Sequence, residues 1–176
     1  MKKLLFACLF CLIPTLARAD SGPYRADWDS LNSRPTPRWY TDAKFGIFIH
    51  WGVYSVPAWS VPGEYSEWYW SHIASPSPAD KPWRDFHAKT FGPNFQYQDF
   101  APMFRAELFD PEQWAKVFAD SGAKYVVLTS KHHEGFCLWP NQQANQTWGR
   151  PWNSVDIGPK RDLLGDLTVA VRKQGL

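Results

Sequence analysis

The sequence has little cysteine and almost no excess of either charge. Only three of its 176 residues are cysteines, and two of these, Cys8 and Cys11, lie in an N-terminal apolar segment. If that segment is removed, Cys137 remains alone and cannot form a disulfide within this chain. A small secreted scaffold held together by disulfides is therefore excluded. The chain must fold on an apolar core.

Long apolar runs are also lacking beyond the first residues. Lys2 and Lys3 precede the apolar run Leu4–Leu16, and Ala17–Ala19 has the small-x-small pattern of a cleavage site. These features predict a secretory signal peptide over residues 1–19. A run of this length is too short to span a bilayer, so we expect no membrane contact after cleavage. The leader predicts a secreted or periplasmic protein, or a lysosomal one if the source is eukaryotic.

The charge balance argues against a nucleic-acid partner. The chain has 19 basic and 17 acidic residues, and the leader holds three of the basic ones, which leaves 16 against 17. Nucleic-acid binding would need a basic face. All eleven tryptophans lie beyond the leader. Their flat apolar faces suit the C–H surfaces of sugar rings, although packing in the core and loops explains a tryptophan equally well.

The first half of the chain predicts one strand followed by long irregular segments. Residues 20–43 are polar and predict an arm or a short helix. The run "KFGIFIHWG", residues 44–52, predicts a buried strand. Residues 53–66 are rich in Pro, Gly and Ser and predict a loop, and a helix is expected to begin within residues 67–73. Residues 74–106 predict an irregular connection with one short helix.

The second half repeats the pattern more clearly. Asp110 is a candidate N-cap for a helix that buries Trp114, Val117 and Phe118 and stops at Gly122. The run Tyr125–Thr129 predicts a second buried strand. After a loop over residues 136–161, a last helix is expected, capped by Asp162, closed by Gly175 and apolar along Leu163, Leu167, Ala170 and Val171.

This order of elements predicts an α/β fold. Short apolar strands that alternate with amphipathic helices are typical of a parallel sheet with covered faces. Long loops after the strands resemble a (β/α)8 barrel of the TIM type, of which residues 20–176 supply the first two or so βα units. We therefore expect this chain to be the N-terminal portion of a longer catalytic domain.

Ionisable and aromatic side chains follow both predicted strands. His50 comes after the first strand, and His132 and His133 come after the second. In a barrel, these strand ends share one rim. The segment "GEYSEWYW" follows the first strand and is expected to bring Glu64, Glu67, Trp68 and Tyr69 to the same side. A further cluster of acids and bases occupies residues 156–162.

Three interpretations of these groups remain open from the residues alone. Three histidines and a carboxylate could hold a catalytic zinc ion, but neighbours on a strand point to opposite faces and no H-E-x-x-H pattern is present. Glu67 or Glu134 could serve glycoside hydrolysis, which normally uses two carboxylates. Each histidine could also be a turn residue with a purely structural role.

Four motifs taken together resemble the N-terminal part of the α-L-fucosidases of glycoside hydrolase family 29. They are "KFGIFIHWGVYSVPAW", "EYSEWYW", "KYVVLTSKHHEGFCLWP" and "VDIGPKRDLLGDL". The resemblance implies a (β/α)8-like barrel and an enzyme that removes terminal α-L-fucose from glycoconjugates with retention of configuration. It implies no metal and no cofactor. A non-catalytic fucose-binding protein and a barrel metallohydrolase are the alternatives.

The resemblance also assigns residues by position. His50, Glu67, Trp68, His132 and His133 match the positions that contact fucose in this family. The two adjacent histidines can reach one ligand if the strand has ended before them. The nucleophile is expected beyond Leu176, with Glu67 as a possible secondary acid/base, so we expect this chain alone to be inactive. No role follows for Lys131 or Glu134.

Overall fold

The computed structural model describes residues 23–176, and the signal peptide expected over residues 1–19 lies outside them. The chain divides after Arg38 into two units, which are described separately. The first contains α1 (Trp28–Asn32), whose N-cap Asp27 accepts a hydrogen bond from the backbone N–H of Ser30. Helix α2 (Arg38–Ala43) begins at the boundary. The arm or short helix expected over residues 20–43 is thus observed as two short helices.

A two-stranded parallel sheet organises the second unit. Strand β1 (Gly46–Ile49) pairs with β2 (Tyr125–Leu128) in a register that places Gly46 opposite Tyr125 and Ile49 opposite Leu128. Both strands lie where the apolar runs predicted them. Strand β2 ends one residue earlier than expected, before Thr129. A crossover of many residues separates the strands, as a parallel pair requires.

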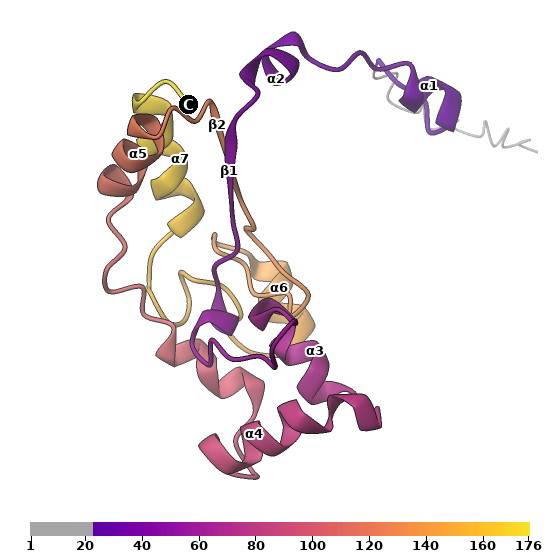
Figure 1. The fold of residues 1–176 in the computed structure, drawn as a ribbon, viewed down its shortest axis with the longest axis vertical. Coiled ribbons are helices and arrows are strands. Elements are labelled where there is room, and N and C mark those ends of the chain that lie inside the picture. The colour runs from indigo at the N-terminus through magenta and orange to yellow at the C-terminus, as the bar shows by residue number, and fades with distance from the viewer. Residues whose placement is uncertain (1–22) are drawn as a thin grey trace, which may run out of the picture. The chain divides into compact units, whose positions relative to one another are not determined.

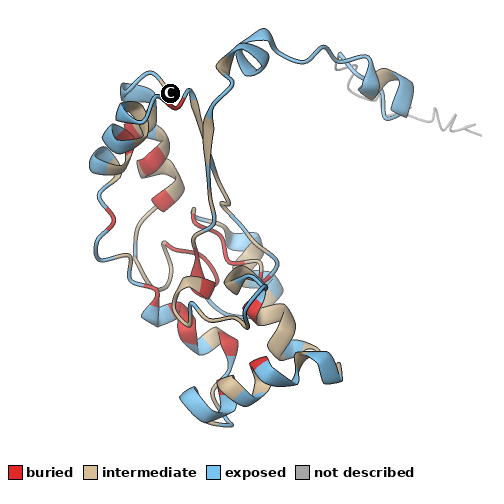
Figure 2. Ribbon diagram, viewed as in Figure 1, coloured by how far each residue is buried: buried red, intermediate tan, exposed pale blue. Residues whose placement is uncertain are grey.

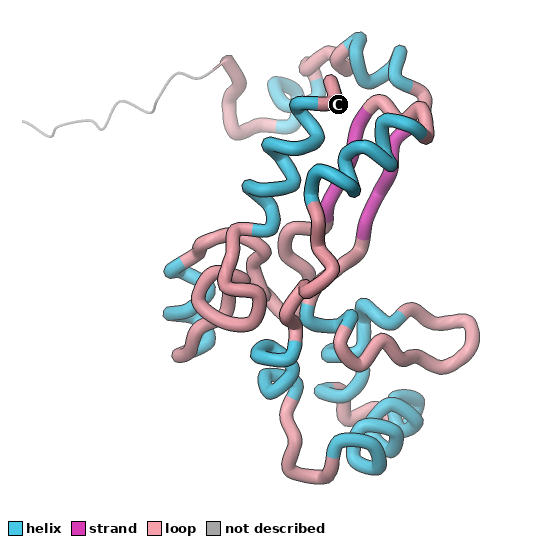
Figure 3. The backbone as a smooth tube through the Cα atoms, turned by 90° about the vertical axis from the view of Figure 1, so that its left-hand side faces the viewer, coloured by secondary structure: helices cyan, strands magenta, loops and turns pink. Residues whose placement is uncertain are grey.

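Two amphipathic helices lie side by side along this sheet (Figures 1 and 3). They are α5 (Pro111–Asp120) and α7 (Leu163–Lys173), and an ion pair of 2.5 Å joins Lys173 to Glu112. The expected caps are present, because Asp110 accepts from the backbone N–H groups of Glu112 and Gln113. The Asp162 carboxylate does the same for Gly165 in α7.

The helices cover one face of the sheet only. The side chains of Phe48 and Val127 oppose each other in the register and are 65% and 42% exposed. Fully buried strands had been predicted, and that prediction was wrong for this face. Alternate strand residues point to opposite sides, and α5 and α7 pack on the other face. Helix α2 reaches the exposed face at Tyr125, whose ring contacts Trp39 and Tyr40. Val117 of α5 is likewise 58% exposed, although it was expected on the buried face.

Most of the core lies among the loops that follow the strands, where Figure 2 shows the buried segments gathered. Its largest fully buried side chains are aromatic: Tyr69, Phe100, Phe136 and Trp152. In chain order, the helices of these loops are η1 (Val53–Ser55), η2 (Ser66–Trp68), α3 (Tyr69–Ala74), η3 (Pro78–Asp80), α4 (Lys81–Phe91), η4 (Tyr97–Met103) and α6 (Gln142–Trp148).

Helix α4 lies within residues 74–106, where one short helix was expected, whereas α6 corrects the loop predicted over residues 136–161. Helix α4 has 11 residues and buries Trp83 and His87, which are one helical turn apart, while Pro82 falls in the first turn where proline is tolerated. The predicted loop over residues 136–161 contains α6, whose N-cap Asn141 accepts from the backbone N–H of Ala144. The left-handed Gly149 ends it.

Gly158 fixes the path of the acid- and base-rich segment at residues 156–162. Its φ is +72°, and a Cβ atom there would lie 2.5 Å from the carbonyl oxygen of Phe104 and 2.6 Å from that of Ala101. Gly158→Ala is therefore expected to lower the free energy of unfolding by about 2–4 kcal/mol, from left-handed strain plus overpacking. Urea denaturation of the full-length protein measures this loss.

Gly149→Ala is the matched control, because Gly149 has a φ of +62° but nothing within 4 Å of a Cβ atom. Only the left-handed strain of about 1–2 kcal/mol applies there. Equal losses in the two variants would show that the backbone contacts of Gly158 do not matter.

Candidate functional site

Three histidines meet where the two strands end. His50 follows β1, and its ring centroid lies 5.5 Å from that of His132, which in turn lies 4.5 Å from that of His133. Strand β2 ends at Leu128, and the backbone N–H of Gly135 donates to the carbonyl of His132 in a turn. Two adjacent histidines can therefore reach the same space. The predicted convergence of the three side chains is confirmed.

Trp68 joins this group from the end of η2. Its ring lies 3.9 Å from His133 at an interplanar angle of 37°, and it meets His132 edge-on at 5.7 Å. The tryptophan is 38% exposed. An accessible aromatic face beside imidazole nitrogens can pack on the C–H surface of a sugar while the nitrogens hydrogen-bond its hydroxyl groups.

His132 is the buried member of the group. Its side chain is 11% exposed, whereas His50 and His133 lie at the surface. Burial lowers the pKa of His132, and His133 and His50 lower it further, against an opposing effect of Glu67. The neutral imidazole is thus favoured at pH 7. Its Nδ1 atom is buried and has no hydrogen-bond partner.

Glu67 and Tyr69 lie in different places: Glu67 is at the site, whereas Tyr69 is in the core. Glu67 is half-buried and close enough to His132 and Tyr54 to affect the pKa of both. Tyr69 was expected at the site, but this prediction was wrong. Its fully buried hydroxyl lies 2.9 Å from Nδ1 of His87, whose Nε2 contacts the carbonyl of Phe95. Tyr69 is the first residue of α3, and this helix turns it inward.

Glu64 was also expected beside Glu67. It is exposed, in the loop that precedes η2. The structure shows no contact between Glu64 and the three histidines in the part of the chain that it describes.

Glu134, which the sequence offered as a candidate carboxylate, lies near His132, and Tyr54 and Tyr97, which it did not single out, lie near Glu134. Glu134 is 2% exposed, and its Oε2 lies 3.8 Å from Nδ1 of His132. Burial raises its pKa to about 7, while its own backbone N–H and Lys131 act in the opposite direction. Tyr54 packs its ring 5.3 Å from His132, and Tyr97 lies on η4. Burial and the charge of Glu134 raise the pKa of both tyrosines, and both hydroxyls are buried without a partner.

The acid- and base-rich segment at residues 156–162 has a structural role. The carboxylate of Asp156 accepts from the side-chain amides of Asn145 and Asn153 at 2.6 and 2.7 Å. Arg161 pairs with Asp166 at 2.7 Å. These contacts tie the loop after α6 to the start of α7 and account for the charges of this segment.

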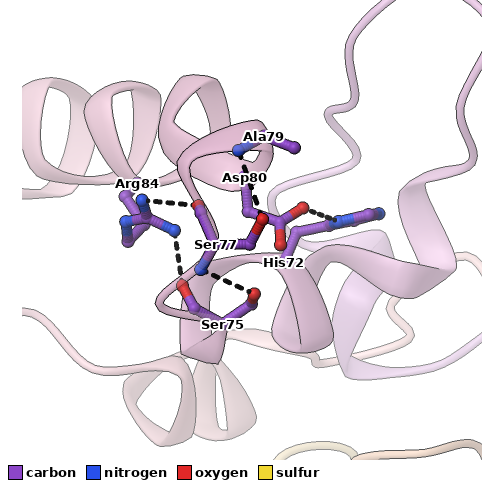
Figure 4. A network of polar contacts seen from close by, with 6 residues as sticks. All are labelled: His72, Ser75, Ser77, Ala79, Asp80 and Arg84. Carbon is purple, nitrogen blue, oxygen red and sulfur yellow. Dashed lines mark hydrogen bonds and ion pairs between the residues drawn. The ribbon is translucent and has the colours of Figure 1, made fainter.

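A clasp of polar contacts fixes α3, which directly follows Trp68 (Figure 4). Nδ1 of His72 lies 2.7 Å from Oδ1 of Asp80, and the His72 ring stacks on Trp83 at 4.0 Å. Arg84 donates to the carbonyls of Ser75 and Ser77. Helix α3 is thereby held to η3 and α4, which in turn positions the tryptophan at the site.

Asp80→Asn is expected to destabilise the protein at pH 7. Hydrogen bonds from Ser75 and His72 lower the pKa of Asp80 in the folded state. Its stabilising contribution is therefore present above the usual aspartate pKa and is lost as the pH falls through the lower folded value. Urea unfolding midpoints should differ between variant and wild type at pH 7 and converge in acid.

Asp85→Asn provides the control for this prediction. Asp85 pairs with Lys81 at 2.5 Å, but the two side chains are 60% and 67% exposed. Exposed pairs of this kind contribute about 0–1 kcal/mol. An equal effect of the two substitutions would contradict a special role for the clasp.

Residues 23–176 contain neither a candidate metal site nor a helix that could span a membrane. No three His, Cys, Asp or Glu side chains among these residues are placed to hold one metal ion. In the same range, no helix combines the length and apolar character needed to cross a bilayer.

The parallel sheet has helices on one side, and aromatic and histidine side chains gather at the carboxyl ends of its strands. These features define an α/β protein with a candidate site at the strand ends. Comparison with known families identifies it further. The family model described as Alpha-L-fucosidase matches residues 11–176. The chain therefore belongs to the alpha-L-fucosidase family, as its motifs predicted.

Individual relatives agree with this assignment. An alpha-L-fucosidase of Dictyostelium discoideum is 49% identical over 168 residues, covering 96% of this chain and 35% of the relative. A tissue alpha-L-fucosidase of Rattus norvegicus is 52% identical over 153 residues, covering 87% of this chain and 30% of the relative. The chain spans about a third of the length of such relatives.

Solved structures show the same relation. The alpha-fucosidase of Thermotoga maritima matches with a TM-score of 0.76 and 48% identity, covering 87% of this chain and 35% of that one. A GH29 alpha-L-fucosidase from Bacteroides thetaiotaomicron matches with a TM-score of 0.57 and 30% identity, covering 90% of this chain and 30% of that one. The chain therefore shares the fold of part of these enzymes.

Proposed function

We propose that this chain forms the first part of a (β/α)8-like catalytic barrel in a retaining exo-glycosidase that hydrolyses terminal α-L-fucose from glycoconjugates. The observation that carries the proposal is the convergence of His50, His132 and His133 with Trp68 at the ends of two parallel strands. Family membership supports the reaction class. The partner is a fucosylated glycan.

The side chains bind the sugar through aromatic packing and through hydrogen bonds. Trp68 and His133 form an aromatic surface on which the apolar face of the sugar packs. Imidazole nitrogens hydrogen-bond hydroxyl groups, so His50, His132 and His133 can each bind one. The neutral state of His132 suits an uncharged sugar, because a buried charge without a partner would be unfavourable.

Glu67 contributes a carboxylate to the same site. Its electrostatic effect on His132 supports a position beside the proposed sugar pocket. We assign it a contact to the sugar and a secondary role as acid/base. Retaining hydrolysis needs a second carboxyl group about 5–5.5 Å away. We place the nucleophile outside residues 1–176 and propose that residues 20–176 alone do not catalyse.

The location of the protein is part of the proposal. The leader at residues 1–19 indicates export, so we propose a secreted or periplasmic enzyme, or a lysosomal one in a eukaryote. Relatives named tissue and plasma alpha-L-fucosidase support this location.

A panel of 4-nitrophenyl glycosides assayed with the full-length protein tests the function. We expect release of 4-nitrophenol from the α-L-fucoside, little from the β-L-fucoside, and no change on adding EDTA. Binding of fucose without hydrolysis would instead support a carbohydrate-binding protein. Loss of hydrolysis on chelation would support a metallohydrolase and overturn the proposal.

A further inference from the structure

The carboxyl group of Glu134 is buried directly behind the sugar-binding histidines. It is 2% exposed, and its Oε2 lies 3.8 Å from the buried Nδ1 of His132. Its backbone is fixed, because the indole N–H of the fully buried Trp152 donates to the Glu134 carbonyl at 2.7 Å. The carboxyl group is therefore held in place behind the ring and cannot reach solvent.

The groups that face this carboxyl offer it little compensation for a negative charge. Tyr54 on η1 and Tyr97 on η4 are near enough for the charge of Glu134 to raise their pKa values, but their buried hydroxyls have no hydrogen-bond partner. Lys131, in its own loop, is exposed and acts on Glu134 only through a weaker Coulomb effect. Burial dominates and raises the pKa of Glu134 to about 7. The neutral acid is thus the main form below neutral pH.

The other ionisable groups nearby, His50, His133 and Glu67, affect the pKa of His132. His50 and His133 disfavour its protonation, whereas Glu67 favours it through its charge and its backbone carbonyl. The net effect is a lowered pKa, so the ring is neutral and carries one hydrogen on one of two nitrogens. Nδ1 lies 3.8 Å from Oε2 of Glu134, and we take Nε2 as the nitrogen that meets the ligand. Whichever nitrogen carries the hydrogen decides whether Nε2 donates or accepts.

We propose that Glu134 is a positioning residue whose protonated carboxyl group donates a hydrogen bond to Nδ1 of His132 and thereby fixes the tautomer in which Nε2–H donates to a hydroxyl oxygen of the sugar. This inference rests on the proposed function. The 3.8 Å separation is longer than a hydrogen bond and is expected to shorten to about 3 Å when sugar is bound, since such contacts often tighten on ligation.

In this arrangement, Nε2–H of His132 donates to the sugar only while Glu134 keeps its proton. When Glu134 loses its proton, the hydrogen of His132 moves to Nδ1 to meet the carboxylate, and Nε2 becomes an acceptor. Because the folded pKa is raised to about 7, the donor is present below that pH and is lost above it. Binding of fucose should therefore weaken as the pH rises through about 7 to 8.

Two substitutions in the full-length protein test this. Glu134→Gln keeps a donor amide but cannot ionise, so its fucose affinity should stay within a few-fold of wild type and lose the decline above neutral pH. Glu134→Met fills the space without a donor, so its Kd for fucose should rise about 10-fold. Glu107→Gln is the control, because Glu107 is exposed and paired with Arg105.

The tautomer is read independently from the ¹⁵N signals of the His132 ring, without substrate. Wild type should show Nε2 protonated below pH 7 and Nδ1 protonated above it, and Glu134→Gln should show Nε2 protonated throughout. Unchanged pH dependence in Glu134→Gln, or wild-type affinity and ring signals in Glu134→Met, would overturn the inference. If Glu134→Met fails to fold, Glu134→Gln still decides. Failure to hydrolyse fucosides would leave the ring signals unaffected and would count against the proposed function instead.

Discussion

His132→Ala in the full-length protein is expected to lower kcat/KM for an aryl α-L-fucoside roughly 10²-fold, equivalent to about 2.7 kcal/mol of transition-state stabilisation. His132 is central to the site, since its ring contacts those of His50, Tyr54, Trp68 and His133. Removing it abolishes the proposed Nε2 hydrogen bond to the sugar and takes away one of the rings that Trp68 and His133 contact.

Thermal unfolding should change little in this variant, because Nδ1 of His132 has no hydrogen-bond partner whose loss would weaken the fold. His87→Ala provides the contrast. Both ring nitrogens of His87 are engaged, with Tyr69 and with Phe95, and its ring is buried. That substitution should destabilise the protein by about 2–4 kcal/mol. If His132→Ala instead unfolded the protein at ordinary temperatures, His132 would be a structural residue.

Glu67→Ala is the second substitution for which we expect a large loss, again roughly 10²-fold in kcat/KM. The kinetic parameter that changes distinguishes its two proposed roles. Loss of a sugar contact alone raises KM, whereas loss of an acid/base group lowers kcat and removes one ionisation from the pH profile.

Glu67→Gln separates these roles further. The amide keeps the size and the hydrogen-bonding capacity of the carboxylate but transfers no proton. Near-wild-type activity in Glu67→Gln with a large loss in Glu67→Ala would restrict Glu67 to binding. Full activity in both would place Glu67 outside the site.

The strands and the gathering of histidines could be predicted from the sequence. Short apolar runs of β-branched and aromatic residues determined β1 and β2, and the carboxyl ends of parallel strands necessarily share one edge. His50, His132 and His133 therefore had to approach one another. Helices α5 and α7 were also predictable, since each has an aspartate cap and an apolar face.

The buried groups behind the site could not be predicted in the same way. Glu134 follows two histidines in a turn, and nothing local shows that its carboxyl group is 2% exposed. Its charge acts on Tyr54 and Tyr97, which come from segments far away in the sequence. The aromatic spacing of α4 contained a helical period, but the surrounding prolines obscured it. In such segments tertiary packing outweighs local preference.

One titration tests the central claim most directly. L-fucose is added to the full-length protein while the side-chain NMR signals of its histidines and of the Trp68 indole are followed, with L-rhamnose as the comparison sugar. We predict saturable shifts with L-fucose for His50, His132, His133 and Trp68, and none for His72 and His87, which are held in the clasp and the core. Binding of L-fucose that leaves His132, His133 and Trp68 unshifted would contradict the account.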